Sequence, residues 1–247
     1  MKVIIIAAGD GSRLGVQTKK LPKALVDING QSILDRQTEL LQGFGLKEII
    51  VVTGPNKDKF TNQNLLYVED SLYQVHEQLG SLMEAHAHFD EELLVLFSDV
   101  LFDQKVLSKI IKTKCDIGIA IDLNWKKDYD GRTQHPIEQA DLALVENNNV
   151  VNIQKNLDSN NNSTGEFIGI MKLSQLGAKK FLDHFNHLKN SHQGKFQNAN
   201  SLDKAYLTDI LQDFIEKGQA ITPIFIDGEW CEIDTPQDLA HARSLFN

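Results

Sequence analysis

The sequence lacks the features that mark several classes of protein. Two of its 247 residues are cysteine, Cys115 and Cys231, which are too few for a disulfide framework and lack the spacing of a zinc site. No apolar run approaches the length of a membrane-spanning helix, and the N-terminus lacks the pattern of a secretory signal. Acids outnumber lysine and arginine, and the net charge of −9 argues against binding along a nucleic-acid backbone. We expect a cytoplasmic protein that binds neither nucleic acid nor membranes.

What the sequence does contain is an alternation of buried strands and amphipathic helices. Strands of this kind, without polar alternation, are typical of a mostly parallel sheet that has helices on both faces. The helix expected from Ser32 onward has Asp35 in the position of a capping-box partner. The fold class is therefore α/β, a Rossmann-like and mostly parallel sheet flanked by helices. The apolar runs lie at residues 3–7, 48–53, 65–69, 93–97 and 115–122.

The pattern changes after residue 122. Residues 124–140 are polar with interleaved aromatic and basic side chains, and residues 141–156 alternate as in a hairpin that turns on asparagines. Residues 222–235 resemble another hairpin-like β segment, and a helix follows. Because there is no internal repeat and no domain linker, we expect one domain over the whole chain. Its parts are a core (1–122), a smaller β-rich region (123–235) and a closing helix (236–247).

A glycine-containing loop follows the first strand, in the stretch AAGDGSRLG. Gly9 and Gly11 permit positive φ and leave no side chain between the backbone and a ligand, so the loop can direct N–H groups at a phosphate. The dinucleotide-binding fingerprint requires glycine where this chain has Leu14, and the Gly-Lys-Ser/Thr end of a Walker A loop is absent. Arg13 and Lys23 supply cations that a triphosphate needs. A tight turn with two surface cations is the alternative.

Acidic side chains follow two further predicted strands. Asp99 comes just after a buried strand, and it should lie near the glycine loop because the carboxyl ends of parallel strands meet at one edge of a sheet. In the stretch EWCEIDTPQDL, Glu232 and Asp234 are two residues apart, so on a strand they face the same way. These carboxylates are candidate ligands of Mg²⁺, with helix capping as the alternative for Asp99. Asp238 instead fits a capping box with Thr235.

The glycine loop and the Pro-Lys pair together resemble the opening of the nucleotidyltransferases of the sugar-phosphate and phosphocholine type. The motif of that family, G-x-G-[ST]-R followed by P-K, is matched at Gly9, Gly11, Ser12, Arg13, Pro22 and Lys23. The resemblance implies the nucleotide-diphospho-sugar transferase type of fold, and a loop from Ala8 to Ser12 that wraps the triphosphate. It also implies that Arg13 holds the β- and γ-phosphates and that Lys23 contacts the α-phosphate.

The last strand and helix resemble the end of the phosphocholine-type cytidylyltransferases. In those enzymes the last aspartate completes a Mg²⁺ site with the first, which here implies Mg²⁺ held by Asp99 and Asp234, with Glu232 as a further ligand. The family usually has Gly-Asp where this chain has Ser98 and Asp99, and this departure leaves the metal ligand in place.

The remaining candidates follow from the family's layout. The family reads base and ribose at the stretch EQLGSLMEA, which makes Gln78, Gly80 and Ser81 candidates, with an ordinary helix start as the alternative. The segment NWKKDYDGRTQHP resembles cytidylyltransferases found with phosphonate biosynthesis. Arg132 would grip a phosphonate or phosphate, aromatic rings would cover an amine through cation–π contact, and Glu166 would pair with it. Surface residues and hairpin caps are the alternative. The acceptor candidates are Trp125, Tyr129, Arg132, His135, Glu166, Tyr206 and Asp209.

This resemblance predicts a Mg²⁺-dependent cytidylyltransferase. It would couple CTP to a small phosphonate or phospho-alcohol, such as 2-aminoethylphosphonate, phosphocholine or phosphoethanolamine, and release pyrophosphate. The choice of CTP rests on the resemblance alone. Residues 1–122 would bind the nucleotide and residues 123–235 the acceptor. A sugar-1-phosphate nucleotidyltransferase and a nucleotide-binding module without turnover are the alternatives, and a homodimer is compatible with the sequence.

Overall fold

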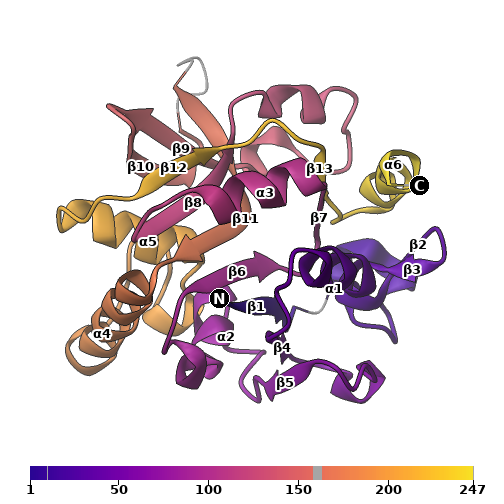
Figure 1. Cartoon of the computed structure of the whole chain (residues 1–247), viewed down its shortest axis with the longest axis horizontal. Coiled ribbons are helices and arrows are strands. Elements are labelled where there is room, and N and C mark those ends of the chain that lie inside the picture. The colour runs from indigo at the N-terminus through magenta and orange to yellow at the C-terminus, as the bar shows by residue number, and fades with distance from the viewer. Residues whose placement is uncertain (10, 158–162, 247) are drawn as a thin grey trace.

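A central sheet organises the chain, and Figure 1 shows helices packed around it. The computed structural model describes residues 1–9, 11–157 and 163–246, and within these residues the sheet has nine strands. The strands are β1 (Lys2–Ala7), β4 (Ile49–Thr53), β5 (Leu66–Glu69), β6 (Leu93–Phe97), β8 (Ile117–Asp122), β9 (Asp141–Glu146), β10 (Asn149–Lys155), β11 (Thr164–Leu173) and β12 (Thr222–Phe225). Their order is β10-β9-β11-β6-β1-β4-β5, with β8 beside β11 and β12 beside β8.

The strands β1, β4, β5 and β6 of the central sheet are parallel, as the sequence predicts. β1 lies between β4 and β6, with Ile4 opposite Ile50 on one side and Val95 on the other. β5 continues in parallel from β4. The strand β11 reverses the direction, because it runs antiparallel to β6, β8 and β9. The carboxyl ends of β1 and β6 therefore open onto one edge of the sheet, next to β11.

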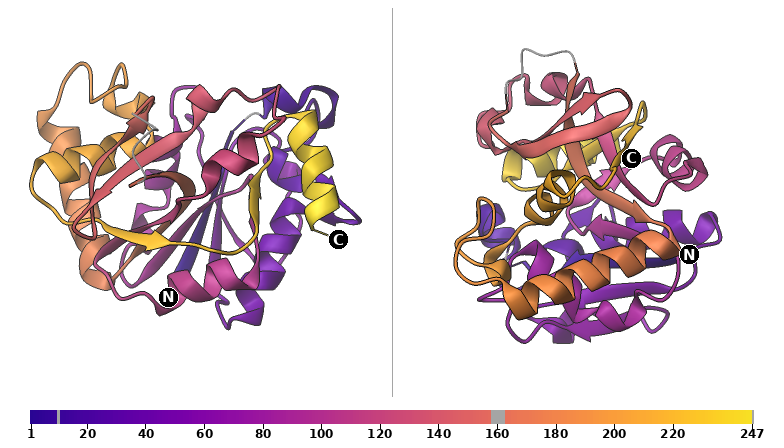
Figure 2. Two further views of the ribbon diagram at one scale, coloured as in Figure 1. Left: turned by 90° about the horizontal axis from the view of Figure 1, so that it is seen from above. Right: turned by 90° about the vertical axis from the view of Figure 1, so that its left-hand side faces the viewer.

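Helices cover both faces of the sheet (Figure 2). Alternate residues of β1 divide between the two cores: Ile4 packs with one set of helices and Ile5 with the other, and each is fully buried. Burial of each such side chain contributes about 1.5–3 kcal/mol. One set comprises α2 (Gln78–Glu84), α4 (Gln175–Ser191) and α5 (Leu207–Glu216), and the other α1 (Ile33–Gly43) and α3 (Gln104–Lys112). No helix among the described residues is long and apolar enough to cross a membrane.

The hairpin predicted over residues 141–156 is confirmed. β9 and β10 pair antiparallel, and Asn147 and Asn148 form the turn with φ of 49° and 60°. Asparagine tolerates this left-handed conformation better than most residues. The predicted loop after this hairpin includes residues 158–162, which lie outside the described residues.

The prediction of a second hairpin-like segment at residues 222–235 is wrong. β12 pairs in parallel with β8, whereas β13 (Trp230–Glu232) pairs antiparallel with β7 (Val100–Phe102). The chain does not turn back on itself, because each strand finds a free edge elsewhere in the fold. The predicted closing helix is present as α6 (Pro236–Leu245), with Thr235 as its N-cap and Asp238 completing the capping box. Strands from both parts of the chain thus share one sheet.

Candidate active site

The glycine loop leaves β1 at the carboxyl edge of the sheet and needs glycine at one position in particular. Gly11 has φ of 62°, and a Cβ there would come within 3.0 Å of the Lys23 and Thr18 side chains. The Thr18 hydroxyl donates to the Gly11 carbonyl at 2.6 Å and closes the loop. Gly9, by contrast, has open space where a Cβ would point. Asp10 lies outside the described residues. The loop is therefore fixed by packing against Thr18 and Lys23 at Gly11, and it faces open space at Gly9.

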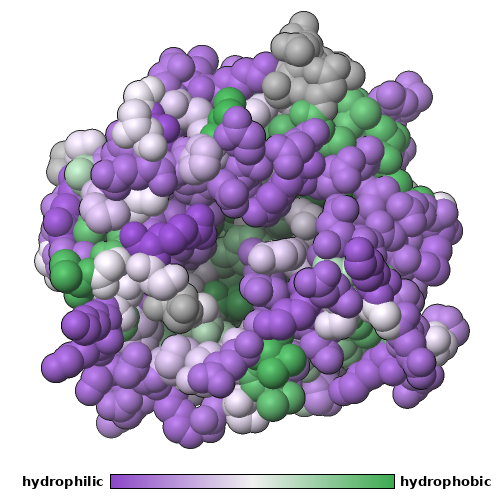
Figure 3. Space-filling model, turned by 180° about the vertical axis from the view of Figure 1, so that it is seen from behind, coloured by the Kyte–Doolittle hydropathy of each residue, from purple (hydrophilic) through white to green (hydrophobic). Residues whose placement is uncertain are grey.

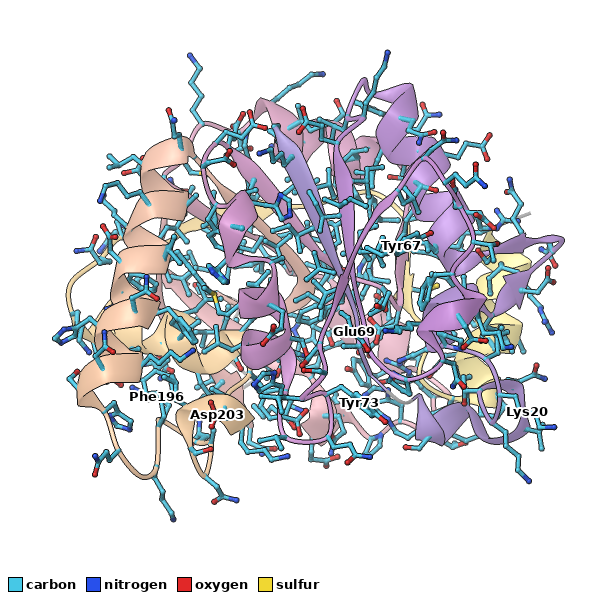
Figure 4. All side chains as sticks on the ribbon, turned by 90° about the horizontal axis from the view of Figure 1, so that it is seen from below. Lys20, Tyr67, Glu69, Tyr73, Phe196 and Asp203 are labelled. Carbon is cyan, nitrogen blue, oxygen red and sulfur yellow. The ribbon has the colours of Figure 1, made fainter. Side chains whose placement is uncertain are left out.

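Two cations from this region meet acidic side chains. The Lys23 ammonium lies 2.7 Å from Asp99 Oδ2 and also contacts Asp234 Oδ1, and one guanidinium nitrogen of Arg13 lies 2.7 Å from Asp234 Oδ2. Burial alone would lower the pKa of Lys23, but the carboxylates outweigh burial and raise it, so the ammonium form persists. Lys20 of the same stretch is exposed at the edge of the molecule (Figure 4).

The pairing of β7 with β13 brings the candidate metal ligands together. Glu232 lies opposite Val100, and the Ile233 N–H donates to the Asp99 carbonyl at 2.9 Å, which places Asp234 beside Asp99. Burial, and then the charges of Asp234 and Asp99, raise the pKa of Glu232 well above its ordinary value. Burial acts the same way on Asp234, but Lys23 and Arg13 hold its pKa below the ordinary value. Lys23 and Arg13 thus compensate the most buried of the three carboxylates.

These carboxylates suit a hard divalent cation. Asp99 Oδ1 is buried and has no hydrogen-bond partner among the described residues. Oxygen ligands from carboxylates are those that Mg²⁺ prefers in proteins. His135 lies 3.4 Å from Asp234 Oδ2, but a guanidinium nitrogen of Arg132 contacts its Nδ1 at 2.9 Å. Burial lowers the pKa of His135 to about 4, so it is neutral at pH 7. The three carboxylates thus offer oxygen ligands to a cation, and the neutral imidazole of His135 lies close to Glu232 and Asp234 as a candidate nitrogen ligand.

The residues of the loop and the carboxylates line one cleft with a volume of about 600 Å³. Figure 3 shows this face hollowed at its centre, where hydrophobic residues form the floor beneath a hydrophilic rim. Such a mixture suits a ligand with a flat base and charged phosphates. The predicted site residues that line the cleft are Gly9, Gly11, Ser12, Arg13, Lys23, Gln78, Asp99, His135, Glu166, Tyr206, Glu232 and Asp234.

Among the described residues, three predicted nucleotide-binding positions lie behind the wall of the cleft. The Ser81 hydroxyl donates to buried Asp70 at 2.8 Å, and Gly80 gives room to the His76 ring, which a Cβ would meet at 2.6 Å. Ala8 is buried at the end of β1. Gly80 and Ser81 therefore hold the start of α2 against the preceding loop.

Most predicted acceptor residues also support the cleft rather than line it. Tyr129 donates to Glu166 Oε1 at 2.8 Å, and Arg132 donates to Asp238 at 2.7 Å. Asp209 accepts the backbone N–H groups of Tyr206 and Asn198, so it fixes the start of α5. In the described part of the lining, Tyr129, Arg132 and Asp209 do not appear. The capping alternative thus describes Asp209 better than the acceptor role does.

Sequence reasoning missed other residues that line the cleft. Asp141 begins β9, directly after the polar segment that was singled out, and Lys155 ends β10. Both contribute to the lining, together with Gln134 and Gln139. The available signal was the acid at the first position of a predicted hairpin strand. That signal is weak, because acids at strand ends are common on surfaces.

A sequence profile of the MobA-like NTP transferase domain matches residues 3–136. This chain belongs to that family. The matched part of this MobA-like NTP transferase includes the glycine loop, Lys23 and Asp99. Glu166, Glu232 of β13 and Asp234 just after β13 lie beyond the matched residues. Their place in the site is therefore known from the structure and not from the profile match. The resemblance inferred from the motif is confirmed.

Relatives of this MobA-like NTP transferase cover its whole length. The CTP:phosphoglutamine cytidylyltransferase of Campylobacter jejuni is 28% identical over 97% of this chain and 98% of that protein. A bifunctional sugar-1-phosphate nucleotidylyltransferase/acetyltransferase of Sulfurisphaera tokodaii is 25% identical over 97% of this chain and 54% of that protein. The structure of the CTP:phosphocholine cytidylyltransferase from Streptococcus pneumoniae covers 100% of this chain and 99% of its own, with a TM-score of 0.76 and 19% identity. The likeness in structure confirms the predicted fold class.

Proposed function

We propose that this chain transfers the CMP group of CTP to a phosphate or phosphonate oxygen of a small acceptor, with release of pyrophosphate. The observation that carries the proposal is the position of Lys23, which lies beside the glycine loop and between Asp99 and Asp234. A binding module needs cations for a triphosphate but no converging carboxylates. This arrangement therefore favours turnover over binding alone.

The reaction needs little covalent work from the protein. The acceptor oxygen attacks the α-phosphorus and a new P–O bond forms. The bond between the α-phosphorus and the oxygen that bridges it to the β-phosphate breaks, and its electron pair leaves with pyrophosphate. The acceptor oxygen is already anionic at pH 7, so no general base is required. Lys23 neutralises charge at the α-phosphate, while Arg13 and the loop N–H groups hold the departing pyrophosphate. To do so, Lys23 and Arg13 must exchange carboxylate partners for phosphate oxygens.

Asp99, Asp234 and Glu232 would hold Mg²⁺, and the unpartnered Asp99 Oδ1 supports this assignment. When bound there, Mg²⁺ supplies positive charge that stabilises the phosphates during transfer. The cofactor proposal predicts that a chelator abolishes turnover and that added Mg²⁺ restores it. CTP binding should survive chelation in part, because the loop, Arg13 and Lys23 do not depend on the metal.

CTP and a phospho-acceptor are supported by the relative from C. jejuni, which is named for CTP and phosphoglutamine and matches over nearly the whole chain. The bifunctional relative, which is named for sugar 1-phosphates, keeps a sugar-phosphate acceptor as the second candidate. Small phosphonates, phosphocholine, phosphoethanolamine and phosphoglutamine are the acceptors that we place first.

The deciding experiment measures pyrophosphate release with Mg²⁺. It crosses CTP, UTP, ATP and GTP with 2-aminoethylphosphonate, phosphocholine, phosphoethanolamine, phosphoglutamine and glucose 1-phosphate. Release that needs CTP and a non-sugar acceptor supports the proposal, and release only with glucose 1-phosphate favours the second candidate. Asp99→Ala, tested beside wild type, should lower the rate about 10²-fold or more while CTP still binds. CTP binding without release across the whole grid would indicate a binding module.

A further inference from the structure

Two carboxyl groups at the acceptor side of the cleft each have a buried oxygen without a partner. Glu166 Oε2 and Asp141 Oδ1 make no hydrogen bond within the described residues, and both side chains line the cleft. Glu166 is 5% exposed, and its other oxygen accepts the Tyr129 hydroxyl at 2.8 Å. Buried polar oxygens in proteins almost always have a partner, so two orphans in one cleft indicate that a ligand supplies it.

The two groups lie on paired strands and repel one another. Glu166 of β11 is opposite Leu142 of β9, the residue next to Asp141. Burial first, and then a contribution from Asp141, raise the pKa of Glu166 to about 8, although Tyr129 and Arg132 act in the opposite direction. Burial also raises the pKa of Asp141 to about 6. This corner of the cleft is thus acidic, and the positive charge of Lys155 in the same lining only partly offsets the effect of burial on Asp141.

Neither nearby cation forms an ion pair with Glu166 or Asp141 within the described residues. The guanidinium of Arg132 contacts Asp238 at 2.7 Å and Glu232 at 3.4 Å. Lys155 is exposed, with its ammonium 3.3 Å from Gln139 Oε1. A water molecule could donate to one of the orphan oxygens, but it brings no positive charge that would let Glu166 and Asp141 ionise in this desolvated corner. A sugar hydroxyl has the same shortcoming. A cation satisfies both requirements.

We infer that Glu166 and Asp141 together bind an ammonium group of the acceptor, at the end opposite to its phosphate or phosphonate. The inference rests on the proposed function, because Lys23, Asp99 and Asp234 must take the phosphate end. Glu166 and Asp141 line the same cleft as Asp99, Glu232 and Asp234, but they belong to the paired strands β11 and β9, whereas the pairing of β7 with β13 positions the metal-ligand carboxylates. The acidic corner is therefore a separate part of the lining, available to the far end of a short acceptor.

The ammonium could come from an amino alcohol or aminoalkylphosphonate, or from an amino acid. Lys155 distinguishes these sources. Its positive charge acts to lower the pKa of Asp141, and its ammonium lies 5.7 Å from the centre of the Tyr206 ring. Lys155 and Tyr206 both belong to the lining of the same cleft. A carboxylate attached beside the ammonium would meet Lys155, whereas an amino alcohol has no group to place there.

The test compares acceptors that differ only in charge. Phosphocholine is paired with 3,3-dimethylbutyl phosphate, in which carbon replaces nitrogen, and 2-aminoethylphosphonate is paired with propylphosphonate. Wild type should prefer each cationic acceptor about 10- to 100-fold in kcat/KM, the effect of a buried charged contact. Glu166→Gln and Asp141→Asn should each remove about 10-fold of this preference through the acceptor KM. The CTP KM should not change. Glu138→Gln, an exposed acid in the preceding segment, is the matched control.

Equal rates with the cationic and neutral members of each pair would overturn the inference and leave the proposed function standing. So would variants that slow both members equally, because that result indicates a structural role. If no acceptor turns over, calorimetry with a non-hydrolysable CTP analogue measures acceptor binding directly, and failure of the cationic acceptors to bind more tightly than the neutral ones overturns it. Lys155→Gln should weaken phosphoserine and phosphoglutamine but not phosphocholine if the natural source is an amino acid. An unchanged phosphoserine and phosphoglutamine KM in that variant assigns the ammonium to an amino alcohol or aminoalkylphosphonate.

Discussion

Asp99 and Asp234 share one cation, because the Lys23 ammonium contacts a carboxylate oxygen of each. The two acids follow different strands, and the pairing of β7 with β13 is what brings them together. In this structure the lysine neutralises the carboxylates that we assign to Mg²⁺. The cations that should hold CTP are thus partly occupied before the substrate arrives, which leads to a first prediction.

Asp234→Asn should lower turnover about 10²-fold or more, since a proposed ligand of Mg²⁺ and a partner of two cations are lost. In metal-free buffer the same variant should bind CTP at least as tightly as wild type, because Lys23 and Arg13 are released toward the phosphates. Calorimetric titration with CTP in the presence of a chelator measures the affinity. Asp90→Asn, which removes an exposed carboxylate that pairs with Lys2, is the control. Weaker CTP binding by Asp234→Asn would contradict this exchange of partners.

The two glycines of the loop should respond differently to alanine. Gly11→Ala places a Cβ against Lys23 and Thr18 at positive φ, so it should destabilise the protein by about 1–2 kcal/mol and also reduce turnover. Gly9→Ala adds a methyl group to open space, so stability should change by less than about 0.5 kcal/mol while the KM for CTP rises. Urea denaturation and steady-state kinetics separate the two effects. Equal losses of stability would refute the distinction.

Asp238 should be a large contributor to stability for its size. Its carboxylate accepts the Thr235 N–H at 2.8 Å and the Asp234 N–H at 3.1 Å, and pairs with Arg132 at 2.7 Å. Asp238→Ala leaves Arg132 without its main partner, so we expect a loss of about 3 kcal/mol in the free energy of unfolding. Asp35→Ala removes the exposed acid at the same position of α1 and should cost about 0.5 kcal/mol. A comparable loss in both variants, measured in urea, would show that only capping matters.

Acceptor affinity should rise with pH between about 6 and 8. Glu166, with a pKa of about 8, is mostly protonated at pH 7 in the free protein. An ammonium group favours the carboxylate, so binding releases a proton and strengthens until the pH reaches about 8. Calorimetry in buffers of different ionisation enthalpy detects the proton. The neutral acceptors serve as the control, since their phosphate groups titrate alike. An identical pH dependence in Glu166→Gln would rule out this residue.

The contribution of Glu166 to the stability of the folded protein should fall as the pH rises, whereas acceptor affinity should increase. A carboxyl whose pKa is raised in the folded state binds more protons there than in the unfolded chain. The contribution of Glu166 is therefore fully present near pH 4 and is lost as the pH rises toward 8. Glu166→Gln should flatten this part of the profile of melting temperature against pH. A steeper fall in the variant than in wild type would contradict the sign.

The sequence was most informative where a short motif determines its own geometry. Gly9, Gly11, Arg13 and Lys23 lie within one stretch, and their spacing predicted that they belong to one site, as their shared cleft shows. Asp99 was predictable because parallel strands end at one edge of the sheet. In both cases local sequence and the general geometry of α/β sheets carry the information.

Elsewhere the sequence was ambiguous for a physical reason. The acid that caps a helix and the acid that binds a ligand have the same chemistry, so Asp209 resembled an acceptor residue although it fixes α5. The pairing of β13 with β7 depends on which edge is free in the folded sheet, and no local pattern encodes that. Asp141 became evident only through the buried oxygen that it leaves without a partner.

The separation of the paired acids along the chain has a consequence for damaged copies of the protein. A chain cut between α5 and β13 would retain the glycine loop, Lys23 and Asp99 but lose Asp234 and the strand that holds it in place. Under the proposed function, such a fragment keeps the cations for a nucleotide but lacks Asp234, which we assign to Mg²⁺. A single cut in this segment should therefore abolish the proposed transfer.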